Sequence, residues 1–175
     1  MLVEIKVQKL VADPITEMPL VILREADGDR VLPILIGPGE AHAIGTEMES
    51  IKFSRPLTHD LLVSVIGSLG GSPEKVVISR VEDDTYYAEL IIRRDEELIS
   101  VDARPSDSIA IALRTRTQIF VEEELLRMLD IAVAESKPVE STLPDGFGRD
   151  EKMDPEQLKE YLRQLDPEDF GRFTP

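Results

Sequence analysis

The chain contains no cysteine and no tryptophan, and only two of its 175 residues are histidine. Without cysteine it forms no disulfide and no thiolate metal site, and two histidines are too few for a histidine-rich zinc centre, so any bound metal would take oxygen ligands. No apolar run approaches the roughly 20 residues of a membrane span. The first residues, MLVEIK, also lack the features of a signal peptide, which predicts a cytoplasmic protein with no membrane partner.

Positive charge is also scarce, because the chain has 35 Asp and Glu but only 20 Lys and Arg, which gives a net charge of -15. Nonspecific binding of nucleic acid is driven by lysine and arginine meeting phosphates, so this balance argues against a general electrostatic grip on nucleic acid. Seven arginines could form a local basic face only if the fold gathers them. They are Arg55, Arg80, Arg93, Arg94, Arg104, Arg114 and Arg116.

Hydrophobic residues make up 42% of the chain, which is enough for one core of ordinary size. Alternation of apolar and polar residues and short turn segments predict strands at residues 2–12, 19–24, 30–36, 76–81, 85–94, 98–103 and 119–121. Apolar residues at helical spacing predict helices at residues 40–51, 58–69, 105–114 and 122–134. The expected fold is α+β, a mostly antiparallel or mixed sheet built from hairpins with helices packed on it.

Two regions of different character follow from the same patterns. Residues 1–134 form the predicted domain, and residues 135–175 form an acidic tail that begins with a linker rich in proline and glycine. Within the tail, residues 155–165 predict a short helix with Leu158, Tyr161, Leu162 and Leu165 on one side. This helix would fold back on the domain, dock on a second subunit or stay mobile, since short helices are marginal alone.

The segment at residues 102–108, DARPSDS, places two carboxylates, a guanidinium and two hydroxyls between a strand and a helix. Pro105 suits the first turn of that helix, where no amide hydrogen is needed. The free amides and positive dipole end of the helix, with Arg104 beside them, would suit a phosphate, and Asp102 and Asp107 could hold a divalent cation. In the simpler alternative, Ser106 or Asp107 only caps the helix.

Three segments carry a family resemblance: LPILIG with EAHAI at residues 32–37 and 40–44, RPLTHDLL at residues 55–62, and DARPSDSIA at residues 102–110. In this order and spacing they resemble the bifunctional nuclease family, whose domain is associated with cleavage of both DNA and RNA. The resemblance covers residues 1–134 and implies a nuclease with nucleic-acid substrates and a homodimer. Gln118 departs from the pattern, since family members tend to have proline before the final strand.

Phosphodiester hydrolysis needs a positioned water, neutralisation of charge on the phosphoryl oxygens and help for the leaving oxygen. The predicted catalytic residues are Glu40, His59 and Asp60. His59 is the candidate general base or acid, because histidine titrates near neutrality without a large perturbation. The structural alternatives are that Asp60 only complements the helix dipole and that His59 only donates to a backbone carbonyl.

Substrate binding is assigned to Arg55, Arg104 and Ser106, with the two guanidinium groups as phosphate clamps. Asp102 and Asp107 are the predicted ligands of Mg²⁺ or Mn²⁺. Arg104 would alternatively form a structural ion pair with Asp102 or Glu40. Arg114 lies outside this predicted site, and Arg114→Lys is therefore expected to change little.

A noncatalytic module is the competing hypothesis. The same Arg, Asp and Ser cluster would then bind a phosphorylated ligand or a protein partner. The acidic balance and sparse histidines favour this interpretation, whereas the family resemblance favours the enzyme.

Overall fold

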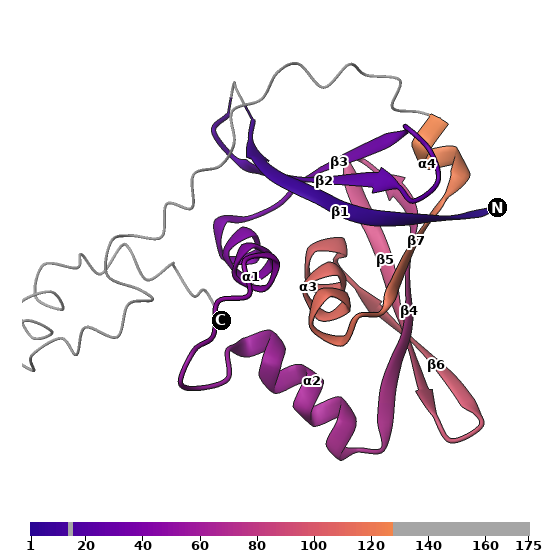
Figure 1. Ribbon diagram of the computed structural model, residues 1–175. Coiled ribbons are helices and arrows are strands. Elements are labelled where there is room, and N and C mark those ends of the chain that lie inside the picture. The colour runs from indigo at the N-terminus through magenta and orange to yellow at the C-terminus, as the bar shows by residue number, and fades with distance from the viewer. Residues whose placement is uncertain (14–15, 128–175) are drawn as a thin grey trace, which may run out of the picture. The chain divides into compact units, whose positions relative to one another are not determined.

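One seven-stranded sheet and the helices beside it make up the computed structural model, which describes residues 1–13 and 16–127 (Figure 1). The strands are β1 (Leu2–Ala12), β2 (Pro19–Glu25), β3 (Val31–Leu35), β4 (Gly71–Glu82), β5 (Thr85–Arg94), β6 (Glu97–Ala103) and β7 (Gln118–Glu122). The helices are α1 (Pro38–Met48), α2 (Thr58–Ser68), α3 (Pro105–Thr115) and α4 (Glu123–Arg127). None of the described helices is long and apolar enough to cross a membrane.

The sheet has the strand order β3-β2-β1-β7-β4-β5-β6. Every neighbouring pair is antiparallel except β4 and β7, which are parallel. After β6 the chain passes through α3 and returns to the middle of the sheet as β7, which lies between β1 and β4. The α+β prediction with a mostly antiparallel sheet is confirmed.

Helix α1 and strand β4 differ most from their predicted boundaries. Helix α1 covers Pro38–Met48 instead of the predicted residues 40–51. It begins at Pro38 because proline fits the first helical position. Strand β4 begins at Gly71, five residues before the predicted start at residue 76. Residues 71–73 pair with β5 ahead of a register shift between Pro73 and Lys75, where a proline without an N–H is tolerated. The predicted helix at 122–134 is described only as far as Arg127, and the predicted linker and helix of the tail lie outside the described residues.

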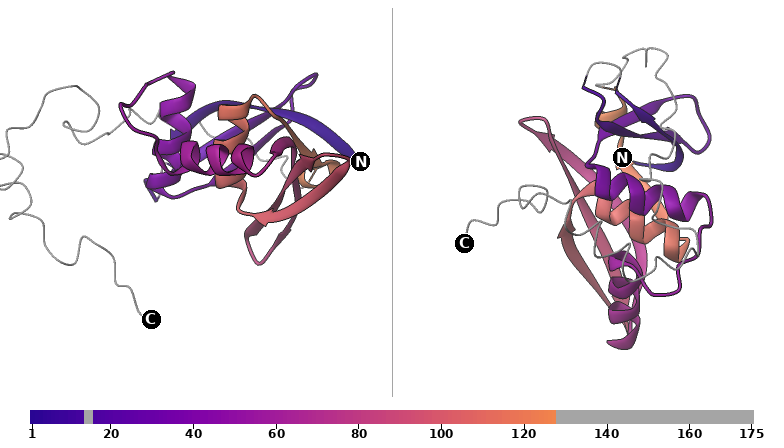
Figure 2. Two further views of the ribbon diagram at one scale, coloured as in Figure 1. Left: turned by 90° about the horizontal axis from the view of Figure 1, so that it is seen from below. Right: turned by 90° about the vertical axis from the view of Figure 1, so that its left-hand side faces the viewer.

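The core lies between the sheet and helices α1, α2 and α3, which pack on the same side of it (Figures 1 and 2). Strand alternation turns Val76, Ile78 and Leu90 toward α3, and all three side chains are buried. Helix α3 is the central helix and contacts both α1 and α2. The relative placement of these three helices therefore depends on the contacts that α3 makes.

Arg114 on α3 joins the three helices through polar contacts. Its Nε donates to Asp60 Oδ1 on α2 over 2.6 Å, and its Nη1 donates to the carbonyl oxygens of Ala43 on α1 and Ala110 on α3 over 3.0 and 2.9 Å. The Arg114 side chain is only 6% exposed. A buried guanidinium loses its hydration, so these three acceptors are what makes its burial tolerable.

Arg114→Lys tests this structural role and reverses the expectation drawn from the sequence. A lysine ammonium cannot reproduce the planar fork that reaches three acceptors, so we expect a loss of about 2 kcal/mol in the free energy of unfolding. Urea denaturation followed by circular dichroism measures it. Arg94→Lys is the control, because Arg94 forms an exposed pair with Glu97 and should change stability by less than about 0.5 kcal/mol. Equal stabilities of the two variants would show that the buried contacts of Arg114 contribute nothing.

Candidate functional site

The N-terminal ends of α1, α2 and α3 border one open groove of about 930 Å³. Each end contributes two residues to its lining: Gly39 and Glu40 from α1, Thr58 and His59 from α2, and Arg104 and Asp107 from the start of α3. The first turn of a helix carries free amide groups and partial positive charge. Three such ends at one groove favour a bound anion.

A charged network joins the three helix ends through Arg104, the residue that precedes the first turn of α3. Its Nε donates to Asp107 Oδ2 over 2.7 Å, and its Nη2 lies 3.1 Å from Asp107 Oδ1 and 2.7 Å from Glu40 Oε1. The guanidinium fork is thus committed to Asp107. Within the described part of the chain Nη1 has no partner, and the side chain is 65% exposed, so one nitrogen stays available to a ligand.

His59 completes the network from the start of α2. Its Nε2 lies 3.1 Å from Asp107 Oδ1, and its side chain is 13% exposed. An Asp carboxylate that accepts from Nε2–H fixes the tautomer and leaves Nδ1 as the acceptor nitrogen of a neutral ring. The predicted general base and a predicted metal ligand are therefore hydrogen-bonded partners.

Asp107 is ionised by virtue of its neighbours. Burial raises the pKa of its carboxyl, but the hydrogen bonds from Arg104 and His59 outweigh burial and hold the pKa below its usual value. With neutral His59, the formal charges of Glu40, Asp107 and Arg104 sum to -1, and protonation of His59 brings the sum to zero. A phosphate in this groove is therefore attracted by the helix ends and Arg104 Nη1 rather than by a net positive cluster.

Glu40 folds back over the start of its own helix. A Cβ added to Gly37 would overlap the Glu40 carboxylate, so a glycine at this position leaves room for it. The same carboxylate contacts Arg104. The glycine that ends the segment LPILIG therefore leaves space for the carboxylate that contacts Arg104.

Asp60 belongs to the framework of the helices. Its Oδ2 accepts from the Leu57 amide over 2.8 Å and its Oδ1 accepts from Arg114. Burial raises the pKa of Asp60, but the Leu57 amide and Arg114 together lower it below the usual value. These contacts match the structural alternative, and Asp60 does not line the groove.

Arg55 and Arg104 are not brought together. Arg55 lines a neighbouring hollow with Lys52 and Arg114, and this hollow shares only Pro56 and Leu57 with the groove. A two-arginine clamp on a single phosphate is therefore not present in this geometry. Ser106 also does not line the groove, and its side chain is buried within the first turn of α3.

Asp102 and Asp107 do not form a ready cation site. Both residues line the groove. In the β5–β6 register, however, Asp102 lies opposite Glu89, so strand alternation points its side chain away from Leu90 and Val101. Asp107 already accepts from Arg104 and His59. No group of three or more His, Asp or Glu side chains in residues 1–13 and 16–127 is arranged to hold a metal ion. The predicted ligands therefore do not fit a cation held by protein groups alone.

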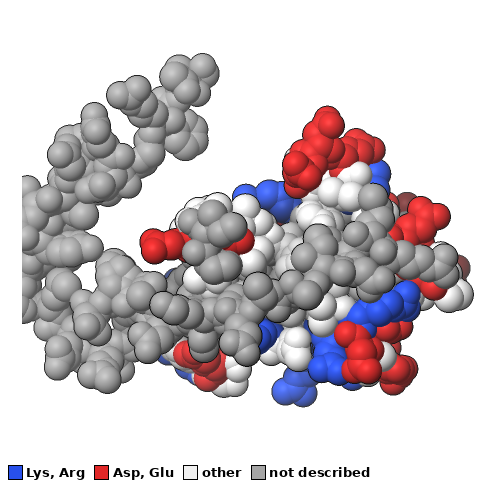
Figure 3. Space-filling model, turned by 90° about the horizontal axis from the view of Figure 1, so that it is seen from above, with Lys and Arg blue, Asp and Glu red and all other residues white. Residues whose placement is uncertain are grey.

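The seven arginines that could have formed a basic face mostly have acidic partners. Five of them pair with carboxylates: Arg80 with Glu82, Arg93 with Glu74, Arg94 with Glu97, Arg104 with Asp107 and Glu40, and Arg114 with Asp60. Basic and acidic side chains are intermixed on the uncovered part of the face shown in Figure 3. Local pairing therefore removes most of the charge that a basic patch would need.

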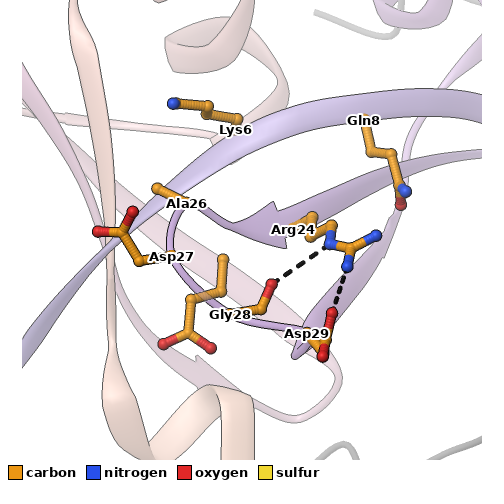
Figure 4. Close-up of a pocket in the computed structure, with 8 residues that line it drawn as sticks. Lys6, Gln8, Arg24, Ala26, Asp27, Gly28 and Asp29 are labelled. Carbon is orange, nitrogen blue, oxygen red and sulfur yellow. Dashed lines mark hydrogen bonds and ion pairs between the residues drawn. The ribbon is translucent and has the colours of Figure 1, made fainter.

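Another hollow, of about 470 Å³, lies away from the groove at the β2–β3 turn (Figure 4). Its lining includes five charged residues, Lys6, Arg24, Glu25, Asp27 and Asp29, and the Arg24 guanidinium donates to the carbonyl of Gly28 and pairs with Asp29. Glu25 beside it accepts two hydrogen bonds from Arg30. These groups close the turn on itself, so the groove at the helix ends is the better candidate for a functional site.

Three residues of the groove lining were not indicated by the sequence, His42, Leu62 and Val101. His42 lies on α1, within the segment EAHAI. It lines the groove and makes an edge contact with Phe53, with ring centroids 6.2 Å apart. The apolar side chains of Leu62 and Val101 also line it. Leu62 sat within a helical stripe and Val101 within a strand, and neither pattern indicates which apolar side chains remain exposed.

Comparison with known proteins identifies the family to which the chain belongs. The model of the bifunctional nuclease domain matches residues 21–134, which include Glu40, His59, Arg104 and Asp107. The protein is a member of the bifunctional nuclease family, and the resemblance seen in the sequence is confirmed.

Similarity to individual proteins varies in extent. An uncharacterized protein of Mycobacterium tuberculosis (strain H37Rv) is 40% identical over 167 residues, which cover 95% of this chain and 97% of that protein. Bifunctional nuclease 1 of Oryza sativa subsp. indica is 28% identical over 125 residues, and bifunctional nuclease 1 of Arabidopsis thaliana is 25% identical over 134 residues. The matches cover 69% and 74% of this chain but only 38% and 41% of the plant proteins.

The lowered pKa values of Asp60 and Asp107 predict a loss of stability in acid. A carboxylate whose folded pKa lies below its unfolded value stabilises the fold above the unfolded pKa of about 3.9, and this contribution disappears as the pH falls through the folded pKa. We expect the free energy of unfolding to decline steeply below about pH 4. Urea denaturation from pH 7 to pH 3 measures this decline.

Asp107→Asn should make the acid decline shallower, because one of the two linked carboxylates is gone. Asp95→Asn in the β5–β6 turn is the matched control, since Asp95 lies at an exposed turn position. A slope for Asp107→Asn identical to that of the wild type would contradict the assigned role of the Arg104 and His59 contacts.

Proposed function

We propose that this protein hydrolyses phosphodiester bonds of DNA and RNA in the groove bordered by the starts of α1, α2 and α3. The observation that carries the proposal is the His59–Asp107–Arg104–Glu40 network at three converging helix ends. The plant relatives whose names state a bifunctional nuclease support the reaction class. In this proposal the DNA or RNA phosphate lies against Arg104 Nη1 and the free amides of the helix ends.

Each of the four side chains has its own role in the proposed reaction. Asp107 orients His59, whose Nδ1 accepts a proton from the attacking water. Arg104 offsets charge that develops on the phosphoryl oxygens, and Glu40 with Asp107 fixes the guanidinium in place. Asp60 stabilises the start of α2, which carries His59, and so acts on the site through position alone.

A divalent cation, Mg²⁺ or Mn²⁺, belongs to the proposal only as a companion of the substrate. The described carboxylates do not form a cage for it, so phosphate oxygens and water would have to supply most of its ligands. The net charge of -15 gives such a cation a second use, because it screens repulsion between the protein and a polyanion. Cleavage assays with added Mg²⁺, with Mn²⁺ and with EDTA separate these cases.

The central test measures cleavage of fluorescent single-stranded DNA and RNA by the purified full chain. His59→Gln retains a hydrogen-bond donor but has no basic nitrogen, and we expect a loss of at least about 100-fold in kcat. Arg104→Lys keeps the charge but cannot hold Asp107 and Glu40 together, and we expect a loss of about tenfold or more. Arg94→Lys, which lies outside the groove, serves as the control and should cleave like the wild type.

Two outcomes would count against the nuclease. Wild-type protein that cleaves neither substrate under any metal condition would leave a noncatalytic module that binds a phosphorylated ligand. Cleavage that survives unchanged in both His59→Gln and Arg104→Lys would place the activity elsewhere or in a contaminant.

We also propose a homodimer. Helix α2 and the residue that follows it carry a stripe of exposed apolar side chains at helical spacing, Leu61, Val65 and Leu69, whose exposed fractions are 58%, 44% and 72%. Such a row of large apolar side chains favours contact with another protein surface, and a second copy of this chain is the proposed one. The expected cytoplasmic location and the absence of a membrane partner stay predictions.

The dimer proposal is tested by the mass in solution. Light scattering after gel filtration should give about twice the 19.6 kDa of one chain. The double variant Leu61→Lys, Leu69→Lys should give one chain mass, because two buried ammonium groups have no partner. A wild-type mass of one chain at micromolar concentration would refute the dimer.

A further inference from the structure

The groove has a second half that the charged network does not use. Away from the helix starts it is lined by aliphatic side chains from α2, α3 and the sheet: Leu62, Ile66, Leu90, Ile92, Val101 and Ile111. Asp102, which follows Val101 in β6, also belongs to the groove lining, but strand alternation turns its side chain toward the face that carries Glu89. The groove therefore joins a polar, anion-favouring end to an apolar end.

The apolar half is partly open to solvent. Ile66, Leu90 and Ile111 are at most 9% exposed, whereas Leu62 and Val101 are 42% and 40% exposed. Exposed aliphatic side chains above a buried apolar layer gain free energy when an apolar ligand surface covers them.

We propose that this apolar half is a nucleobase-binding subsite, which takes a base of the strand whose phosphate lies at Arg104. The inference rests on the proposed function and deepens it. A nucleotide couples an anionic phosphate to a flat, largely apolar base, and the groove presents the matching pair of surfaces in one continuous lining. Its volume of about 930 Å³ lies within the range of small-molecule sites.

The β6 strand supplies the means to test this separately from cleavage. Val101 lies opposite Leu90 and faces the groove, while Leu98 lies opposite Arg93 and alternates to the other face of the sheet. Both side chains are exposed, 40% for Val101 and 53% for Leu98. Val101→Ser and Leu98→Ser therefore make the same kind of change on the two faces of one strand.

The experiment compares two ligands with the same phosphate, adenosine 5′-monophosphate and ribose 5-phosphate, by titration of the full chain at pH 7. If the base is bound, we expect the nucleotide to bind at least about tenfold more tightly. Val101→Ser and Leu62→Ser should weaken nucleotide binding by about threefold to tenfold and leave ribose 5-phosphate unchanged. Leu98→Ser should leave both affinities unchanged. Circular dichroism confirms that each variant is folded.

Equal affinities of the two ligands for the wild type would overturn the subsite, and so would failure of both to bind at millimolar concentrations. Equal effects of Val101→Ser and Leu98→Ser would also overturn it. If Leu62→Ser and Val101→Ser alter the solution mass but not nucleotide binding, the apolar half is a contact between copies instead. If the protein cleaves nucleic acid but binds the nucleotide and ribose 5-phosphate equally, only the subsite is refuted. If it binds the nucleotide more tightly but does not cleave, the subsite is supported and the nuclease activity is refuted.

Discussion

The buried guanidinium of Arg114 is the contact on which the rest of the site depends. It reaches α1 through the Ala43 carbonyl, α2 through Asp60 and its own helix through the Ala110 carbonyl. Asp60 in turn binds the Leu57 amide at the start of α2, which is where His59 lies. A single side chain in the last turn of α3 therefore ties the start of α2 and the middle of α1 to the helix whose first turn carries Asp107.

The convergence of helix ends explains how a strongly acidic protein can present a place for an anion. Most described arginines are neutralised by neighbouring carboxylates, and the network around Arg104 has no net positive charge while His59 is neutral. What remains attractive is the free amides, the dipoles of the helix starts and one nitrogen of Arg104. Forces of this kind act over a few ångströms, so they favour a ligand that is inserted between the helices over one that is drawn from a distance.

Local pattern was sufficient to predict the strands, hairpins and helices, because alternation, turn residues and capping positions act within a few residues of one another. The same logic brought Arg104 and Asp107 together, three residues apart at a helix start. It also selected Glu40 and His59 through family motifs, and the structure brings all four into one network.

Local pattern did not indicate contacts between distant segments. Asp102 and Asp107 both line the groove, but Asp107 is held by Arg104 and His59, and Asp102 lies opposite Glu89 in the β5–β6 register. Arg114 and Asp60 are 54 residues apart, and nothing in either local pattern indicates that they meet. Arg55 and Arg104 were paired by chemistry alone, and the fold places them at different hollows.

The close approach of Glu40 to Gly37 limits how this sequence can change. Any side chain at position 37 must displace the Glu40 carboxylate, and that carboxylate holds Arg104. The atom that a Cβ at position 37 would meet is the end of a flexible side chain, so the carboxylate can move away, and the cost of the substitution falls on the contact between Glu40 and Arg104. Arg104 would then be held by Asp107 alone.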